Sequence, residues 1–190
     1  MTMRNHLLLF LAGVCALLGV GCSAETPETQ QQPEYQATAT VRELMDSIID
    51  PSADVVWDSV AVLISPTGME EKQPRTPEEW AEVRRGAIRL IEASNLLVIP
   101  GRRIAKPGET ADDPQSELRP EKIQAMVDAD PAKWAAQSRK LHDAGVEMLQ
   151  VIDMKDPEGV LQLGEKIYNA CEDCHTQYWY PEDAGAQNAN

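Results

Sequence analysis

The sequence is poor in the residues that several classes of protein require. It has four cysteines in 190 residues, and two of these, Cys15 and Cys22, lie in or next to an apolar N-terminal stretch. The remaining pair is too small a set for a disulfide-built scaffold, which a chain of this length does not need. Basic residues are also scarce, because 17 Lys and Arg stand against 31 Asp and Glu, a net charge of −14. This negative charge disfavours binding to nucleic acid and favours binding to a basic partner protein.

The chain also lacks an apolar run long and uniform enough to read as a membrane-spanning helix. Its most apolar stretch, residues 7–20, follows Arg4 and is typical of a secretory signal. The stretch ends in LLGVGCSA, which resembles the cleavage box of bacterial lipoproteins. The resemblance implies that residues 1–21 are a signal peptide and that Cys22 carries lipid, which anchors the protein in the periplasm to the inner or outer membrane. An uncleaved anchor and an ordinary signal are the alternatives, and both also place the domain outside the cytoplasm.

The rest of the chain divides by composition. Residues 22–37 are polar, contain proline and predict a flexible tether, and residues 184–190 predict a disordered tail. Between them, residues 38–183 show four helical stretches, no internal repeat and no clear run of alternating strands. Four amphipathic helices predict an all-α, antiparallel four-helix bundle. The turn-rich residues 65–76 have room for a short hairpin.

The first helical stretch contains two apolar patterns. Apolar residues at 41, 44, 45 and 48 share one helical face, and a second pattern continues from Asp50 to residue 64. Asp50 has the side chain of an N-cap, and Pro51 suits a first helical position. The pattern leaves open whether this stretch is one kinked helix or two.

The other helices have clear starts. Thr76 and Glu79 form a capping box, Asp130-Pro131 opens the third helix and Asp156-Pro157 the fourth. A long loop follows Pro100-Gly101, with a short helix over 120–129. The apolar spacing predicts three inward stripes: Trp80, Val83, Ala87, Leu90, Ser94 and Leu97; Trp134, Ser138, Leu141, Gly145, Met148 and Ile152; Leu161, Gly164, Tyr168, Cys171, His175 and Tyr178.

The last stripe contains the most informative motif, CEDCH. Cys171, Cys174 and His175 lie at i, i+3 and i+4, so a helix projects all three from one face. C-x-x-C-H is the attachment signature of c-type haem, in which two cysteines form thioethers and the adjacent histidine binds the iron. The motif therefore predicts one covalent haem c.

Two other sites use the same residues. A thioredoxin-like C-x-x-C belongs at a helix start in a βαβ context, whereas this pair lies well inside a helix. A tetrahedral zinc site needs about four ligands, and outside the predicted signal the only other histidine is His142. Haem is the interpretation that these residues favour.

At these residues the chain resembles the class II cytochromes c, which include cytochrome c prime. The similarity spans residues 38–180 and is carried by RELMDSI, DPAKWAAQSRKLHDA and, most specifically, LGEKIYNACEDCHTQYW. It implies that Met45 is the sixth iron ligand opposite His175, as in low-spin members, with Leu44 and Ile48 as the other residues able to face the iron. It also implies haem packing by Trp134 and, as one option, a homodimer through the first two helices.

These features together predict an electron carrier rather than an enzyme, since no nucleophile and base stand at supportive spacing. A five-coordinate protein that binds nitric oxide or carbon monoxide is the alternative, although Trp179 stands where the family usually has arginine. A haem peroxidase or reductase, and a haem subunit of a larger complex with loop 101–120 as interface, are further options. Residues 178–180, YWY, predict either an exposed docking patch or a cover for the bundle end.

Overall fold

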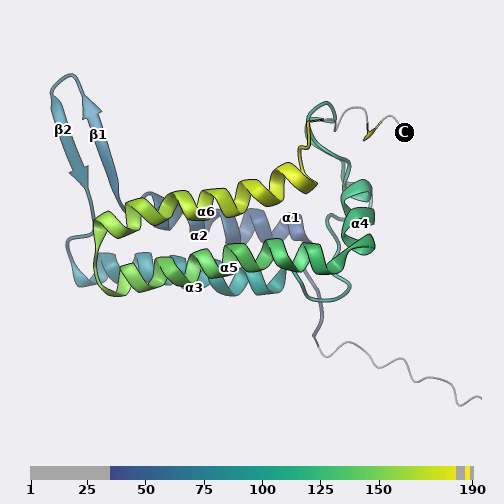
Figure 1. Cartoon of the computed structure of the whole chain (residues 1–190), viewed down its shortest axis with the longest axis horizontal. Coiled ribbons are helices and arrows are strands. Elements are labelled where there is room, and N and C mark those ends of the chain that lie inside the picture. The colour runs from purple at the N-terminus through teal and green to yellow at the C-terminus, as the bar shows by residue number, and fades with distance from the viewer. Residues whose placement is uncertain (1–34, 183–186, 189–190) are drawn as a thin grey trace, which may run out of the picture. The chain divides into compact units, whose positions relative to one another are not determined.

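The computed structural model describes residues 35–182 and 187–188, which form a mostly helical domain with one small antiparallel sheet (Figure 1). The predicted signal, the predicted lipid site at Cys22, most of the tether and most of the tail lie outside these residues. Within them, no helix is both long and apolar enough to cross a membrane. The elements are, in order, α1 (Val41–Leu44), η1 (Met45–Ile49), α2 (Asp50–Trp57), β1 (Ala61–Ser65), β2 (Gly68–Lys72), α3 (Pro77–Leu96), α4 (Pro120–Ala129), α5 (Pro131–Asp153) and α6 (Pro157–Tyr178).

The first helical stretch is one continuous run that contains a π-helical turn. Thr40 caps it through a capping box with Glu43, and the backbone stays helical through η1 into α2. Asp50 N–H donates to the Met45 carbonyl, five residues back, as a π-helix requires. The wider turn stands immediately before Pro51, whose ring would clash with the carbonyl four residues back in a regular α-helix. The interpretation of Asp50 as an N-cap is therefore wrong, because Asp50 lies inside the run.

The helix predicted to continue to residue 64 ends at Trp57 instead. Residues 61–65 form β1, which pairs with β2 in a register that sets Ala61 opposite Lys72 and Ser65 opposite Gly68. The run is rich in β-branched residues, and a short apolar run cannot be assigned to helix or strand by periodicity alone. An all-α chain is therefore incomplete as a description. Only the turn and β2 fall within residues 65–76, where the sequence left room for a hairpin, whereas most of β1 precedes them.

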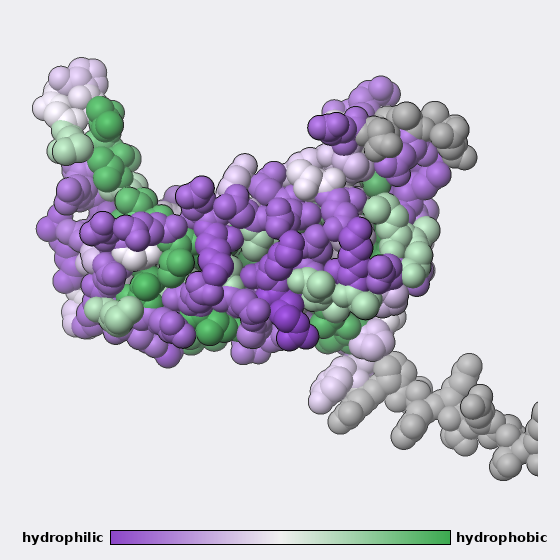
Figure 2. All heavy atoms as spheres, viewed as in Figure 1, coloured by the Kyte–Doolittle hydropathy of each residue, from purple (hydrophilic) through white to green (hydrophobic). Residues whose placement is uncertain are grey.

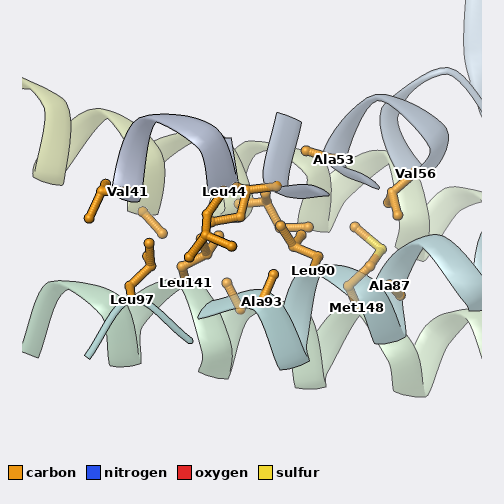
Figure 3. Packing of buried hydrophobic residues seen from close by; sticks show 14 of the residues in the cluster. Val41, Leu44, Ala53, Val56, Ala87, Leu90, Ala93, Leu97, Leu141 and Met148 are labelled. Carbon is orange, nitrogen blue, oxygen red and sulfur yellow. The ribbon is translucent and has the colours of Figure 1, made fainter. Parts of the chain in front are cut away.

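The longer helices begin where the sequence predicts. Thr76 and Glu79 form the capping box of α3, while Asp130 and Asp156 cap α5 and α6. The predicted stripes of α3 and α5 are buried throughout. Figure 3 shows residues from both stripes packed against the first helical run. The core lies between these helices.

The inward face of α6 differs from the predicted one. Leu161 and Tyr168 are 49% and 54% exposed, whereas Val160, Ile167 and Ala170 are buried. The buried face of α6 therefore begins one position before the predicted stripe, at Val160 instead of Leu161. It meets the predicted stripe again at Cys171, which is half-buried, and at Tyr178, which is buried.

Each long helix packs against its neighbours at close range. α3 packs against α5, α5 against α6, and α2 against both α3 and α6. The short connection after α5 makes α5 and α6 antiparallel neighbours (Figure 1). Gly86 marks the closest approach of α3 to α2, because a Cβ there would lie 2.8 Å from Val55 Cγ1.

The loop predicted over 101–120 is tied to the helices at both ends. The Arg103 and Ile104 carbonyls accept hydrogen bonds from the first amides of α1, and Leu118 N–H donates to the Trp179 carbonyl after α6. Ile104 and Leu118 are almost fully buried. The two ends of the segment therefore reach the core beside the predicted short helix α4, while most residues between them are exposed.

Replacing Gly86 with alanine tests the approach of α2 to α3. The new Cβ meets Val55 Cγ1 at 2.8 Å and the Ser52 carbonyl at 3.2 Å, so one helix must shift. We expect a loss of about 1–3 kcal/mol in the free energy of unfolding, measured in urea. The matched control is Gly164→Ala, whose Cβ would make an ordinary 3.4 Å contact with Trp57 Cδ1 and should gain up to about 1 kcal/mol. Equal effects of the two changes would contradict this packing.

Candidate functional site

The predicted site residues meet at a hollow where the first helical run faces the end of α6. The hollow has a volume of about 260 Å³ and is lined by Met45, Trp134, Cys174 and His175 among others. A second hollow of about 30 Å³ adjoins it and adds Cys171. Both hollows are lined by Met45, Cys174 and His175, so the structure brings together side chains that lie about 130 positions apart in the sequence.

Met45 is the residue of the RELMDSI segment that lines both hollows. Leu44 is buried in the core, and neither Leu44 nor Ile48 lines either hollow. The π-helical turn begins at Met45 and so changes which side chains face α6. Ile49, four residues on, lines the smaller hollow beside it.

The two cysteines are free, half-buried thiols on the face of α6 that borders the hollows. Burial raises the pKa of Cys171 to about 11, and the negative charges of Asp50 and Glu172 act in the same direction. Burial likewise raises the pKa of Cys174 to about 12. Both thiols are therefore protonated near neutral pH, unlike the thiolates of redox-active C-x-x-C motifs.

Trp134 is fixed at the inner wall of the site. Its indole Nε1 donates to the Leu97 carbonyl at 2.9 Å, and its ring meets Tyr178 edge to face at 5.2 Å. The Leu97 carbonyl lies at the end of α3, where helical carbonyls lack a partner of their own. The predicted contact residue thus also joins α5 to the end of α3.

The residues after α6 fold back over the site. The amides of Trp179 and Tyr180 both donate to the His175 carbonyl, which ends the helix. Tyr178, Trp179 and Tyr180 all line the larger hollow, and Tyr178 is buried. This arrangement supports a cover at the helix end, one of the two predicted roles of YWY. Because Trp179 and Tyr180 are only partly buried, the docking role stays a prediction.

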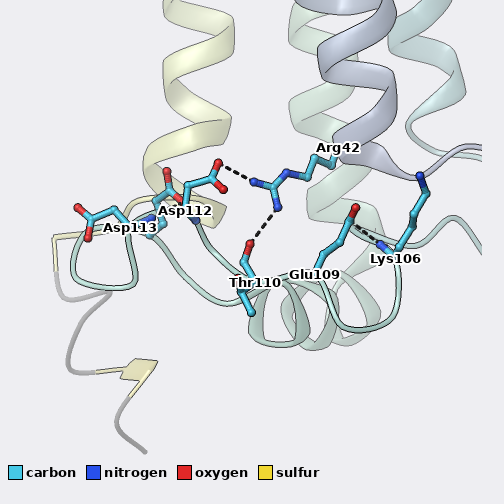
Figure 4. Close-up of polar contacts among 7 residues, drawn as sticks. Arg42, Lys106, Glu109, Thr110, Asp112 and Asp113 are labelled. Atoms are coloured by element: carbon cyan, nitrogen blue, oxygen red, sulfur yellow. Dashed lines mark hydrogen bonds and ion pairs between the residues drawn. The ribbon is translucent and has the colours of Figure 1, made fainter.

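The loop after α3 lines one side of the larger hollow and is held by the polar contacts that Figure 4 shows. Arg42 donates to the Thr110 carbonyl at 2.9 Å and to Asp112 at 2.6 Å, and its guanidinium carbon lies 6.0 Å from the centre of the Trp179 ring. Lys106 pairs with Glu43 at 2.5 Å. These contacts hold residues 104–117 against α1.

Sequence reasoning did not find several residues of this site. Ile104 and Glu117 line the hollow from the loop, and Asp50 lines it from α2. Partial burial raises the pKa of Asp50, while the charge that His175 can carry acts against that shift. The only available signal was the isolated Ile104 in a polar loop, because contacts across such distances leave no local pattern.

Comparisons with known proteins do not assign this chain to a family. No protein family, curated protein or solved structure matches the chain. Among the described residues, no three His, Cys, Asp or Glu side chains cluster in a way that could hold a metal ion. His142 lies away from the hollows and pairs with its neighbour Asp143.

Trp134→Phe tests the link between α5 and the end of α3. The change removes the indole N–H and leaves a buried carbonyl without its donor, so we expect a loss of about 1–3 kcal/mol in the free energy of unfolding. Trp57→Phe is the matched control, since Trp57 is half-buried and donates to Gly164, inside α6, at 3.1 Å. For Trp57→Phe, the free energy of unfolding should fall by less than about 1 kcal/mol in the same urea titration. A larger loss for Trp57→Phe would refute this assignment.

Proposed function

We propose that this protein is a class II-type c-type cytochrome that carries electrons through one covalently attached haem. The observation that carries the proposal is the shared hollow, in which Met45 lies opposite the face of α6 that bears Cys174 and His175, with Cys171 in the adjoining hollow. Such a haem supplies one-electron oxidation and reduction at its iron. In this proposal the domain is an antiparallel four-helix bundle made of α1–η1–α2, α3, α5 and α6.

The residues present fit a haem in their chemistry. Two free thiols three positions apart can each form a thioether, and an imidazole follows directly. Met45 supplies a thioether sulfur from a separate element, so His175 and Met45 would be the two iron ligands. A methionine opposite a histidine raises the reduction potential relative to two histidines and leaves no open position for a small ligand.

The surroundings would hold and shield the group. Trp134 packs at the inner wall, and Ile104 and Ile123 add apolar surface. Arg42 also lines the hollow and is paired with Asp112, and its guanidinium is the group there that could bind an acidic group of a haem. Residues 104–117 and 178–180 cover the site, which limits access of water to the ligands.

Features of the sequence support a proposed location and a proposed kind of partner. In this proposal, Cys22 carries lipid and tethers the domain to the periplasmic face of a bacterial membrane. A tether raises the effective concentration at a membrane-bound redox partner. The excess of acidic residues suits a partner with a basic docking face.

The optical spectrum of the full-length chain, expressed with a haem-attachment system, tests the proposed ligands. We expect covalent haem with a low-spin reduced spectrum that does not change when carbon monoxide is added. Met45→Leu should retain covalent haem but bind carbon monoxide, because it opens one axial position. Met148→Leu is the matched control: it makes the same change in the buried core away from both hollows, and should leave the spectrum as in wild type.

The other outcomes separate the alternatives. A wild-type protein that binds carbon monoxide would exclude ligation by Met45 and favour the five-coordinate, gas-binding alternative. The same spectrum for Met45→Leu and wild type would assign the sixth position to another residue. Absence of covalent haem would reject the cytochrome proposal altogether.

A further inference from the structure

The β1–β2 hairpin exposes apolar side chains that nothing in the described part of the chain covers. Ile64 and Met69, which face each other across the two strands, are 83% and 70% exposed, and Val62 and Leu63 are also exposed. Figure 2 shows β1 as an apolar strip that extends from a mainly polar surface. A two-stranded sheet is marginally stable in water by itself, so additional strands would stabilise this hairpin.

We propose that the hairpin pairs with a second copy of this chain, through the free edge of β1. A free edge carries a row of unpaired backbone donors and acceptors, which is the usual template for strand addition. The edge of β1 lies outside the proposed haem site, so this pairing does not depend on haem.

Charge selects β1 rather than β2 as the pairing strand. β1 has the sequence AVLIS and carries no charged residue, whereas β2 contains Glu70, Glu71 and Lys72. Antiparallel pairing of β2 with itself about Glu70 would set like charges directly opposite each other, which is unfavourable. The edge of β1 has no such penalty.

The sequence of β1 is complementary to itself. In a symmetric antiparallel pair centred on Leu63, Val62 lies opposite Ile64 of the partner subunit, and the two copies of Leu63 are opposite each other. The product is a four-stranded sheet in the order β2, β1, β1, β2. Four strands exceed the number that an independent sheet needs, and pairing brings apolar side chains of the two β1 strands into lateral contact.

The position of the hairpin suits two acidic molecules. Each copy has a net charge of −14, which opposes contact between the helical bodies. The base of the hairpin lies beside Asp156 and Pro157 at the start of α6, and its tip extends away from the helices (Figure 1). The candidate site is at the other end of this 22-residue helix, about 30 Å away. Pairing through β1 therefore separates the charged bodies and leaves the site accessible.

A disulfide test on the full-length chain can detect this pairing. In Leu63→Cys, the two introduced thiols face each other at the symmetry axis, at a separation that a disulfide can span after small adjustment. Under mild oxidation in the expressing cells, we expect a disulfide-linked homodimer on a non-reducing gel. Glu71→Cys, exposed on the other strand, is the matched control and should cross-link at least roughly tenfold more slowly, because its partner lies across two strands. Both variants retain the native cysteines, so any background from these is shared.

A second substitution separates edge pairing from general stickiness. Ile64→Lys places a charge on β1 and should suppress cross-linking of Leu63→Cys, while Met69→Lys, on the facing position of β2, should leave most of it. Added salt should speed cross-linking, because it screens repulsion between the acidic bodies. Neither result depends on haem, whose absorbance reports the proposed function separately.

Three results would overturn the proposal. Equal cross-linking of Leu63→Cys and Glu71→Cys would indicate random collision. Equal suppression by Ile64→Lys and Met69→Lys would indicate contact through the face of the hairpin rather than its edge. A cross-link from Leu63→Cys to a different protein, without the homodimer, would assign β1 to another partner.

Discussion

The candidate site is built on the π-helical turn that begins at Met45, just before Pro51. Pro51 cannot be accommodated by a regular turn without a clash at the carbonyl four residues earlier, and η1 widens the helix at that point. In this run Leu44 enters the core, while Met45 borders the hollow that His175 also lines. The wider turn also shifts the side chains that follow it relative to those of α1, and Met45 and Asp50, five residues apart, both border this hollow.

The surrounding segments enclose this hollow through contacts of long sequence separation. Arg42 holds the loop after α3 through Thr110 and Asp112, and Leu118 binds the backbone that follows α6. Trp134 joins the inner wall to the end of α3. The end of the domain that bears the predicted ligands is therefore heavily cross-connected, while the hairpin at the other end projects into solvent. This difference fits a domain that shields a redox group at one end and associates at the other.

Local sequence signals predicted the parts of the fold that local chemistry decides. The capping boxes and the Asp-Pro starts located α3, α5 and α6, and spacing alone found the buried stripe of α5. The same reasoning failed for residues 61–64, because a short β-branched run satisfies both helix and strand patterns. It also misplaced the start of the α6 seam at Leu161. The three site residues on α6 follow from their spacing, but Asp50 and Glu117 come from distant segments and could not be predicted.

The most direct test of the central claim is mass spectrometry of the peptide that contains residues 171–175. The full-length protein would be produced with a haem-attachment system and digested before analysis. We expect one haem on this peptide, joined through both Cys171 and Cys174, and no free thiol at either position. An unmodified peptide, or one with the two cysteines joined as a disulfide, would contradict it.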